Sequence, residues 1–571
     1  MTSPNSFYKQ RASDDYRASM REFGGRLASS GSELLRARQD EGPFQFDVAI
    51  IGSGYGGAVC AARLAAKLGR PDRICVIERG QEWVPGTFPD TVESASQQTR
   101  FDLVSQRKNK LNNPIGLMNS AKFDEVSILA GSGLGGGSLI NANVAVRPDS
   151  DVFQTGDWPQ ELTDPAVLSP YYDRAAAELG IATEELDQTP KMRLNRQSME
   201  RMAGASFAPA DLAIARGSSG NLPIYNAQGM RQRACIDCGD CCSGCNVGAK
   251  NSLNLNYLPL ARRLGARMFT QCEVDQLEKE AGGYRIQLRH YHDGRTNRQP
   301  YIRGSVTAQI VIIAAGSLGS TEILLRSQSP SLRFSSHLGS HWSGNGDMLA
   351  FIRDIPQLTN IGGRGAYPSR EPPVGPTIQS NVTFPSRPNV RDRLLLQEGA
   401  IARAYANVVG LVVRDLNFDH TMVILAMGHD GSQGRITLDE NGHALIKWPG
   451  MLDSEYRRRV QQEFSRLATA FRGNYRALRA FGDNLVTVHP LGGCKLGDHP
   501  DNGVVNHWGQ VFDPEHLAQS GGSAIHDGLY VADGSIIPSS LGANPFLTIS
   551  ALSERIAERI SVEPKYADLK R

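Results

Sequence analysis

Five of the nine cysteines in this chain lie within eleven residues, in the run CIDCGDCCSGC. Cys235, Cys238, Cys241 and Cys245 of this run have the spacing C-x2-C-x2-C-x3-C. Thiolates at this spacing hold iron–sulfur clusters, which take up and release electrons. The run therefore predicts a cluster of the 3Fe–4S or 4Fe–4S type. It also predicts that electrons pass onward to an external acceptor, either a protein or a quinone.

Two other interpretations of the cysteine run stay open. Cysteine pairs separated by two residues also suit tetrahedral zinc, and the five thiols could instead be reduced, unmetallated packing groups. A disulfide framework is not expected in a large chain without a secretory signal. A cluster needs only four thiolates, and spacing alone makes Cys242 the spare one. Asn246 stands where ferredoxin runs usually carry proline.

A second set of chemically competent residues lies near the C-terminus, where HPLGGC begins at His489 and GANPF contains Asn544. Oxidation of an alcohol to a carbonyl by hydride transfer needs a base for the hydroxyl proton, and histidine is the usual base near neutral pH. An asparagine amide can donate to the same hydroxyl or accept from it. We therefore expect His489 and Asn544 to form the catalytic pair.

The segment FDVAIIGSGYGG predicts a buried strand, a tight turn and a helix, the elements that position a dinucleotide. Gly52, Gly54 and Gly57 form G-x-G-x-x-G: the first permits the turn, the second lets the backbone approach a pyrophosphate, and the third lets helix and strand pack closely. The helix N-terminus offers free N–H groups to phosphates. Glu78, at the end of the next predicted strand, can accept hydrogen bonds from a ribose.

A second glycine-rich segment, GSGLGGGSLINANV, lies between apolar runs and favours FAD over other dinucleotides, because small residues let the chain pass close to a bulky flavin. We expect Gly131, Gly135, Ser138 and Asn141 to lie at the cofactor. Further expected contacts are spread over the rest of the chain: Val274 at the adenine, and Asp533, Pro545 and Phe546 in the C-terminal segment. The helix that follows would direct its positive N-terminal end at the flavin.

The chain has 571 residues, which predicts at least two domains. Its net charge of +2 offers no field for nucleic acid or an anionic membrane surface. No apolar run reaches the roughly 18 residues that span a bilayer, so no transmembrane segment is expected. The first residues lack the apolar core of a secretory signal, and we expect a cytoplasmic protein.

The order of motifs predicts how the domains are divided. Residues 1–44 are polar and are expected to be a solvated N-terminal extension, with a helix near 14–38, or alternatively a docking arm. Residues 45–148, 233–340 and 481–571 are assigned to the cofactor-binding domain. Residues 149–232 and 341–480 are assigned to the substrate-binding domain.

These motifs together resemble the glucose–methanol–choline (GMC) family of flavoprotein oxidoreductases. The resemblance rests on GSGYGG with Glu78, on GSGLGGGSLIN, on HPLGGC and on VADGSIIPSSLGANPFLTI. Within the family the chain is most similar to the bacterial cholesterol oxidase branch. The resemblance implies an α/β fold with a Rossmann-like FAD-binding domain and a mixed-sheet α+β substrate domain. It also implies that His489 and Asn544 contact the substrate hydroxyl and that Asn141 lies at the flavin.

The resemblance also implies a small-molecule alcohol as substrate, hydrophobic or sterol-like, with a sugar as the alternative substrate of an iron–sulfur flavin dehydrogenase. A third alternative is an oxygen-using oxidase without a cluster. His341, Trp342 and Asn345 are candidates for the substrate side. Cholesterol oxidases use a pocket glutamate for double-bond isomerisation. The stretch LNFDHTMVILAM has no glutamate, and Asp419 is its nearest acidic residue.

Overall fold

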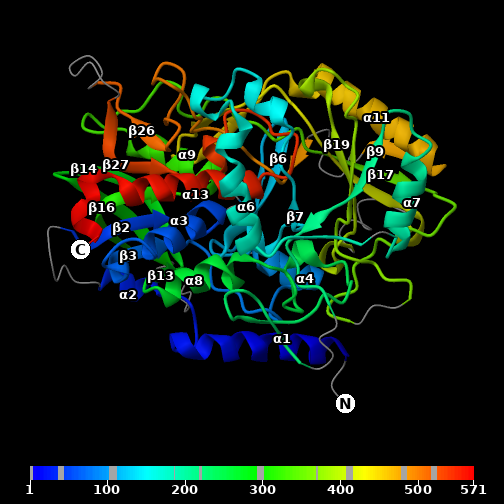
Figure 1. Cartoon of the computed structure of the whole chain (residues 1–571), viewed down its shortest axis with the longest axis horizontal. Helices are drawn as coiled ribbons and strands as arrows, with labels where there is room; N and C mark the ends of the chain where they lie inside the picture. The colour runs from blue at the N-terminus through cyan, green and yellow to red at the C-terminus, as the bar shows by residue number, and fades with distance from the viewer. Residues whose placement is uncertain are drawn as a thin grey trace.

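A computed structural model describes residues 4–36, 44–101, 112–185, 187–217, 222–291, 301–367, 371–406, 416–477, 485–515 and 524–570. The described chain contains two large sheets that lie beside one another, one in each half of the molecule (Figure 1). A smaller four-stranded sheet carries two of the predicted motifs. None of the helices in these ranges is long and apolar enough to cross a membrane.

The first large sheet has nine strands, and most neighbours in its central part run parallel. Its strands are β1 (Ser29–Ser30), β13 (Arg267–Thr270), β3 (Ile74–Ile77), β2 (Phe46–Ile51), β16 (Tyr301–Ile313), β15 (Gly283–Tyr291), β14 (Cys272–Glu280), β26 (Gln510–Phe512) and β27 (Ile525–Val531). β2 and β3 are buried along their whole length, as expected of parallel strands covered on both faces. This is the Rossmann-like α/β fold that the sequence predicts.

Helices cover this sheet and are tied together by one buried carboxylate. α13 (Phe546–Val562) packs against α3 (Tyr55–Ala65) and α6 (Ser169–Glu178), and α3 also packs against α8 (Tyr257–Arg263). Glu554 of α13 has no exposed surface and accepts hydrogen bonds from Arg63 Nε at 2.8 Å and Tyr257 Oη at 2.7 Å. A single buried carboxylate therefore fixes the C-terminal helix against two helices from the first half of the chain.

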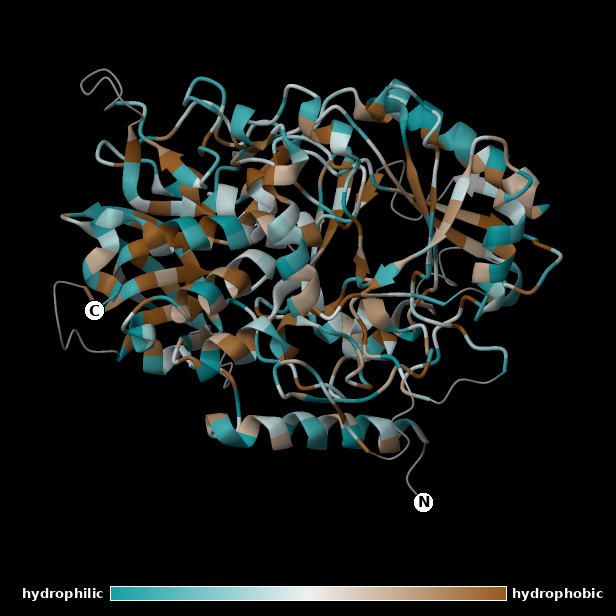
Figure 2. Ribbon diagram, in the orientation of Figure 1, coloured by the Kyte–Doolittle hydropathy of each residue, from teal (hydrophilic) through white to brown (hydrophobic). Residues whose placement is uncertain are grey.

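The second large sheet has six strands whose pairings are all antiparallel. They are β23 (Asn474–Ala477), β17 (Met348–Arg353), β20 (Met422–Met427), β19 (Leu395–Gly399), β18 (Ser380–Thr383) and β9 (Ser206–Pro209). α11 (Glu455–Phe471) and α7 (Pro190–Met199) pack against it. Apolar side chains of these strands and helices form a second hydrophobic core, separate from that of the nine-stranded sheet. The apolar residues of both sheets gather in the interior (Figure 2).

The four-stranded sheet brings two motifs to one edge. It consists of β25 (Leu485–Thr487), β6 (Val126–Gly131), β5 (Met118–Lys122) and β4 (Thr99–Phe101). β25 runs parallel to β6, with Thr487 opposite Ile128. Because parallel strands end at the same edge, the segment that starts at His489 and the second glycine-rich segment leave the sheet side by side.

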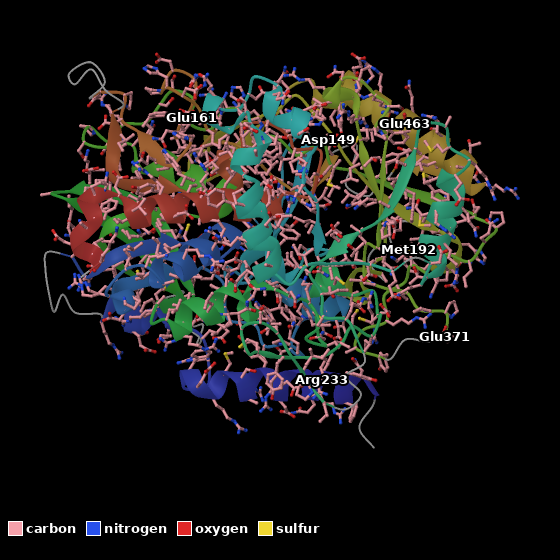
Figure 3. The ribbon with its side chains drawn as sticks, in the orientation of Figure 1. Asp149, Glu161, Met192, Arg233, Glu371 and Glu463 are labelled. Atoms are coloured by element: carbon pink, nitrogen blue, oxygen red, sulfur yellow. The ribbon has the colours of Figure 1, made fainter. Side chains whose placement is uncertain are left out.

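The N-terminal segment is part of the folded body, so the prediction of a solvated arm is wrong. α1 spans Pro4–Met20 rather than 14–38, and it is followed by the short helix α2 (Gly31–Leu35). Ala12, Tyr16 and Met20 are buried. Their four-residue spacing forms an apolar stripe that the polar composition of the segment conceals. Asp15 of α1 binds Arg233, which lies just above the helix in Figure 3.

The remaining α-helices and β-strands connect these layers, and all of them except α9 are short. They are α4 (Val92–Gln97), β7 (Val144–Ala145), β8 (Ala182–Thr183), β10 (Asp211–Leu212), β11 (Ile224–Tyr225), β12 (Arg231–Gln232), α9 (Gly316–Ser327), β21 (Arg435–Leu438) and β22 (Ala444–Lys447). α9 follows β16 directly and packs against β14 and β21.

The two glycine-rich segments are joined through Ser53 and Glu78. Ser53 Oγ donates to Glu78 Oε2 at 2.6 Å and accepts from the Gly135 N–H at 3.0 Å. The same carboxylate accepts from the Ser53 N–H at 3.1 Å, the Gly80 N–H at 2.8 Å and the Gly133 N–H at 3.3 Å. Glu78 is 6% exposed, so these contacts satisfy a carboxylate that would otherwise be costly to bury.

Replacement of Glu78 by glutamine tests this junction. The amide can accept at only one atom and would turn its NH₂ group toward backbone donors, which leaves buried N–H groups unsatisfied. We expect Glu78→Gln to lower the free energy of unfolding by about 1–3 kcal/mol, measured by urea denaturation. Glu440→Gln, at an exposed turn, is the matched control and should change stability by less than about 0.5 kcal/mol. Equal stability of the two variants would contradict the role given to Glu78.

Candidate functional site

The first glycine loop follows β2 and leads into α3. Gly52 has φ +99°, and a Cβ there would lie 2.2 Å from Ala314 O. A Cβ on Gly57 would lie 2.0 Å from Gly52 O, so the helix and the turn pack backbone against backbone. A Cβ on Gly54, by contrast, would meet no atom within 4 Å. The loop is therefore tight on its protein side and open where the first turn of α3 presents its N–H groups.

The second glycine loop follows β6 and lies against the first. Gly135 and Gly136 adopt positive φ, and a Cβ on Gly136 would come within 2.8 Å of Gly54 Cα. Gly131 is similarly crowded, with a Cβ position 2.9 Å from Gly136 O. Ser138 is fully buried; its hydroxyl donates to Gly135 O at 2.7 Å and accepts from the Leu253 N–H at 3.0 Å. Ser138 thus holds the loop in shape through its own protein contacts.

Asn141 connects both loops to the C-terminal helix. Its Nδ2 donates to Tyr55 Oη at 2.8 Å. The Tyr55 ring stacks on Phe546, the first residue of α13, with centroids 4.8 Å apart. Tyr55 carries no signal in the sequence beyond its place inside the glycine motif, so sequence reasoning missed its part in the site. The stack fixes the start of α13 beside the two glycine loops.

Three other predicted cofactor residues, Asp533, Pro545 and Val274, are buried. Asp533 is buried; it accepts from the Gly316 N–H at 2.8 Å, from the Ser535 N–H at 2.8 Å and from two serine hydroxyls. Burial raises the pKa of Asp533. Pro545 is buried at the N-cap of α13. Val274 lies in β14, whose first residue, Cys272, donates its N–H to Glu78 O at 2.9 Å.

His489 is held by a carboxylate that the sequence did not identify. Its Nδ1 lies 3.0 Å from Asp347 Oδ1. The side chain of Asp347 has no exposed surface, and its other oxygen accepts from Thr487 Oγ1 at 3.0 Å and the Val488 N–H at 2.9 Å. With Nδ1–H donated to this carboxylate, Nε2 is the basic nitrogen of the ring. Asp347 and His489 come together because the nearby residues Ser343 and Leu491 exchange backbone hydrogen bonds.

Asn544 is oriented by a second residue that sequence reasoning missed. Gln397 Nε2 donates to Asn544 Oδ1 at 2.7 Å, and Asn544 Nδ2 donates to Gln397 Oε1 at 3.2 Å. Asn345 holds the preceding loop: its Nδ2 donates to Ala543 O at 2.8 Å and its Oδ1 accepts from the Leu541 N–H at 2.9 Å. Asn345 and Asp347 are two residues apart, so one short segment positions both members of the predicted catalytic pair.

The side chains of the other candidates on the substrate side make different contacts. Trp342 is fully buried and packs edge-on against Trp448, with centroids 4.9 Å apart, which makes it a core residue. His341 has its ring 6.1 Å from that of His337, and burial lowers its pKa to about 4. Asp419 is exposed in a 3₁₀ turn that ends at His420. Because it is exposed, Asp419 is not the buried acidic group that double-bond isomerisation would need in a substrate pocket.

Four of the five clustered cysteines line one cavity. Cys235, Cys238, Cys241 and Cys245 lie around it, whereas Cys242 is not among its lining residues and has its Sγ 3.8 Å from Thr377 Oγ1. These four cysteines are the ones that have the spacing C-x2-C-x2-C-x3-C. Burial raises the pKa of the Cys242 thiol to about 11, but it also raises the pKa of the Cys235, Cys238 and Cys241 thiols. The feature that sets Cys242 apart is its place outside the cavity lining.

The charged groups around this cavity connect it to the second glycine loop. Lys250 is buried and donates to Asn141 O at 2.8 Å and to Cys241 O at 3.0 Å. Asp240 is also buried; it accepts from the Gly365 and Arg403 N–H groups, and burial raises its pKa to about 6. One lysine thus bridges the carbonyl of the predicted flavin residue and that of a predicted cluster ligand.

The four cavity cysteines do not form a ready-made site for a single ion. Nowhere in the described ranges do three or more His, Cys, Asp or Glu side chains come together as ligands of one ion. Tetrahedral zinc needs such convergence, whereas the thiolates of an iron–sulfur cluster bind different iron atoms.

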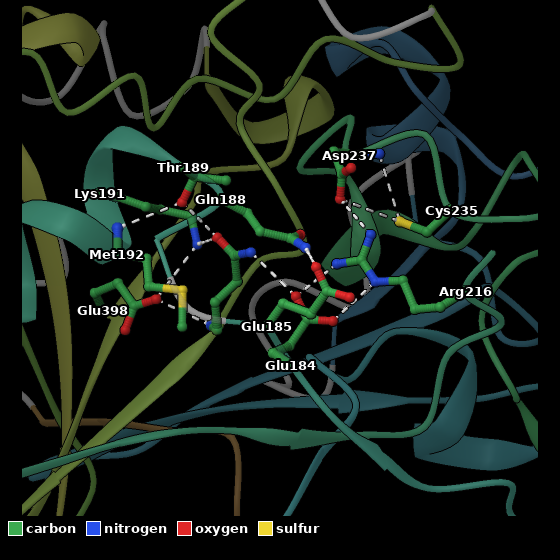
Figure 4. A network of polar contacts seen from close by, with 11 residues as sticks. Glu184, Glu185, Gln188, Thr189, Lys191, Met192, Arg216, Cys235, Asp237 and Glu398 are labelled. Carbon is green, nitrogen blue, oxygen red and sulfur yellow. Dashed lines mark hydrogen bonds and ion pairs between the residues drawn. The ribbon is translucent and has the colours of Figure 1, made fainter. Parts of the chain in front are cut away.

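A polar network leads from the cysteine cavity toward β19 (Figure 4). Asp237 Oδ1 lies 3.8 Å from Cys235 Sγ and 2.7 Å from Arg216, which also binds Glu184. From Glu184 the network continues through Gln379 and Lys191 of α7 to Glu398 of β19. Its members are Glu184, Gln379, Lys191 and Glu398, joined successively at 3.1, 3.0 and 3.4 Å. Glu398 is the residue after Gln397, so the network ends beside the strand that orients Asn544.

The glycine loops fit FAD by their shape and by their unused polar groups. Cβ atoms on Gly54, Gly137 and Gly316 would each meet nothing within 4 Å. Nearby, Ser132 Oγ and Asn119 Oδ1 are buried without a hydrogen-bond partner in the described part of the chain. Open space beside helix N-terminal amides and unpaired polar atoms is what a bound dinucleotide would fill.

Comparison with known proteins agrees with this geometry. Family models described as GMC oxidoreductase match residues 55–332 and 430–553. The chain is 28% identical over 565 residues to a cholesterol oxidase of Mycobacterium tuberculosis, covering 90% of each chain. It is 26% identical to a cholesterol oxidase of Acinetobacter baumannii, covering 90% of this chain and 94% of the relative. A long-chain-alcohol oxidase of Arabidopsis thaliana is 23% identical, covering 94% and 69%.

Solved structures share the fold. Pyridoxine 4-oxidase from Mesorbium loti superposes with a TM-score of 0.60 at 17% identity, covering 90% of this chain and 99% of that one. A variant of Aspergillus oryzae formate oxidase superposes with a TM-score of 0.61 at 15% identity, covering 92% and 99%. The chain belongs to the GMC oxidoreductase family, whose members bind FAD and oxidise CH–OH donors.

Proposed function

We propose that this enzyme oxidises a hydrophobic, sterol-like alcohol to a carbonyl, and that an iron–sulfur cluster relays the electrons to an external acceptor. The observation that carries the alcohol chemistry is the Asp347–His489 pair, which leaves His489 Nε2 as a base. The observation that carries the relay is the cavity lined by four cysteines next to the second glycine loop.

In this proposal His489 Nε2 accepts the hydroxyl proton of the alcohol, and Asp347 stabilises the imidazolium that forms. Asn544 hydrogen-bonds the same hydroxyl and orients it, while Gln397 fixes the direction of the Asn544 amide. FAD, when bound, supplies the ring that takes up the hydride from the alcohol carbon. Loss of the proton and of the hydride together leaves the carbonyl product.

The protein groups that would hold FAD come from four segments. They are Gly52, Gly54, Gly57 and Glu78 of the first β–α–β unit, Gly131, Gly135, Ser138 and Asn141 of the second loop, Val274 of β14, and Asp533, Pro545 and Phe546 of the C-terminal segment. The hydrogen bonds of Ser53 and Glu78 hold the first two of these segments together. A ribose contact at Glu78 would add to the four hydrogen bonds that its carboxylate already accepts.

The substrate class is proposed from the relatives and from the second sheet. Two of the relatives are named cholesterol oxidases and a third a long-chain-alcohol oxidase. The second sheet has a core of its own, separate from that of the nine-stranded sheet, and Gln397 projects from it to Asn544. Glu398 follows Gln397 but is fully buried against Lys191, so Asn544 meets an amide rather than a carboxylate. We therefore expect oxidation without double-bond isomerisation.

An oxygen-using oxidase is the second candidate, because these relatives are named oxidases. The two candidates differ in where the electrons go. Anaerobic bleaching of the flavin by cholesterol or 1-dodecanol, but not by glucose, would support the proposed substrate class. Rapid peroxide formation in air, with no reduction of a quinone or protein acceptor, would favour the oxidase.

Substitutions at the Asp347–His489 pair test the proposed base. We expect His489→Ala to lower kcat/KM by about 10²–10⁴-fold. Asp347→Asn should lower it by about 10²–10⁴-fold as well, because an amide no longer fixes the protonated nitrogen. His499 and Asp501 form a surface pair at the same 3.0 Å separation. His499→Ala and Asp501→Asn are therefore matched controls that should retain activity. Full activity of His489→Ala would contradict the proposed role.

Metal analysis of cysteine variants tests the cluster. Protein purified without oxygen should contain iron and acid-labile sulfide in near-stoichiometric amounts for a 3Fe–4S or 4Fe–4S cluster. Serine at Cys235, Cys238, Cys241 or Cys245 should remove most of the iron, whereas Cys242→Ser should retain it. Zinc in place of iron, or an equal loss from all five variants, would overturn the assignment of ligands.

A further inference from the structure

Asn143 has a buried amide that the fold leaves unused. The residue is 2% exposed, and neither its Oδ1 nor its Nδ2 has a hydrogen-bond partner in the described part of the chain. A buried amide without partners costs free energy and calls for an explanation. Asn143 also adopts φ +66°, a left-handed conformation that asparagine tolerates better than most residues.

The surroundings of Asn143 fix where this amide acts. It lines the cavity of Cys235, Cys238, Cys241 and Cys245, and it lies two residues after Asn141 in the second glycine loop. Its carbonyl accepts from the Ala213 N–H at 3.0 Å, and β7, which follows it, pairs with β10. The backbone around Asn143 is therefore anchored at the wall of the cavity.

A second asparagine at the same cavity shows what a satisfied amide looks like. Asn246 also lines the cavity. Its Oδ1 accepts from the Phe88 N–H at 2.9 Å and its Nδ2 donates to Phe88 O at 3.0 Å. Asn246 thus holds the fold together, whereas no residue in the described ranges is a hydrogen-bond partner of the Asn143 amide.

We infer that Asn143 Nδ2 donates a hydrogen bond to a sulfur of the cluster held by the four cysteines and thereby raises its reduction potential. This inference rests on the proposed cluster. Reduction adds negative charge to the cluster and its sulfurs, so an N–H donor stabilises the reduced state more than the oxidised one. Because Asn143 and Asn141 share one loop, the same backbone segment sets the cluster potential and contacts the proposed flavin site.

Two substitutions remove the donor without straining the backbone. Asn143→Gly suits positive φ and removes the amide, while Asn143→Asp keeps the shape but replaces NH₂ with oxygen. The experiment is a redox titration of the anaerobically purified full-length protein, followed by EPR for the cluster and by absorbance for the flavin. We expect both variants to weaken one-electron reduction of the cluster roughly tenfold, a fall of about 59 mV, with an unchanged flavin potential.

Asn246→Ala is the matched control from the same cavity. It should lower the free energy of unfolding because it breaks both contacts to Phe88, and it should leave the cluster potential unchanged. An unchanged cluster potential in both Asn143 variants would overturn this inference, as would a shift confined to the flavin. Wild-type protein without iron and sulfide would overturn the inference together with the proposed relay, whereas a cluster with unshifted variants would overturn the inference alone.

Discussion

The buried carboxylate of Glu78 is the interaction on which the site depends. It accepts hydrogen bonds from the turn after β2, from Gly80 after β3 and from Gly133 after β6. These three segments belong to two different sheets, and each would leave unsatisfied N–H groups without the carboxylate. The two glycine loops can approach as closely as Gly54 and Gly136 do only because this junction satisfies their backbone groups. The open space beside α3 follows from that approach.

The elements that carry chemistry could be predicted because their signals are local. A few neighbouring residues are enough to predict the strand–turn–helix around Gly52 and the second glycine loop. The structure contains both elements. Asp347 and Gln397 could not be predicted in the same way. Their roles follow from long-range pairings, Ser343 with Leu491 and β19 within the six-stranded sheet, which no local pattern encodes. The buried stripe of α1 was missed because three apolar residues are diluted among charges.

The site residues are held by segments from the four-stranded sheet, the six-stranded sheet and the start of α13. His489 leaves the four-stranded sheet at the edge shared with the second glycine loop, while Asn544 precedes the helix that stacks on Tyr55. Both are fixed by residues 345 and 347, just before β17 of the six-stranded sheet. Lys250 ties Asn141 of the second loop to the cysteine run. In the proposed function, one glycine-rich loop therefore lies between the flavin and the cysteine cavity that would receive its electrons.

The most direct test of this arrangement is the order in which the two redox groups change after substrate is added without oxygen. Rapid-freeze EPR and flavin absorbance should be followed on the same mixture of full-length enzyme and a reducing alcohol. The account predicts that flavin absorbance falls first and that the cluster EPR signal then changes while oxygen is still absent. Complete and stable flavin reduction with an unaltered cluster signal, reversed only when oxygen is admitted, would contradict it.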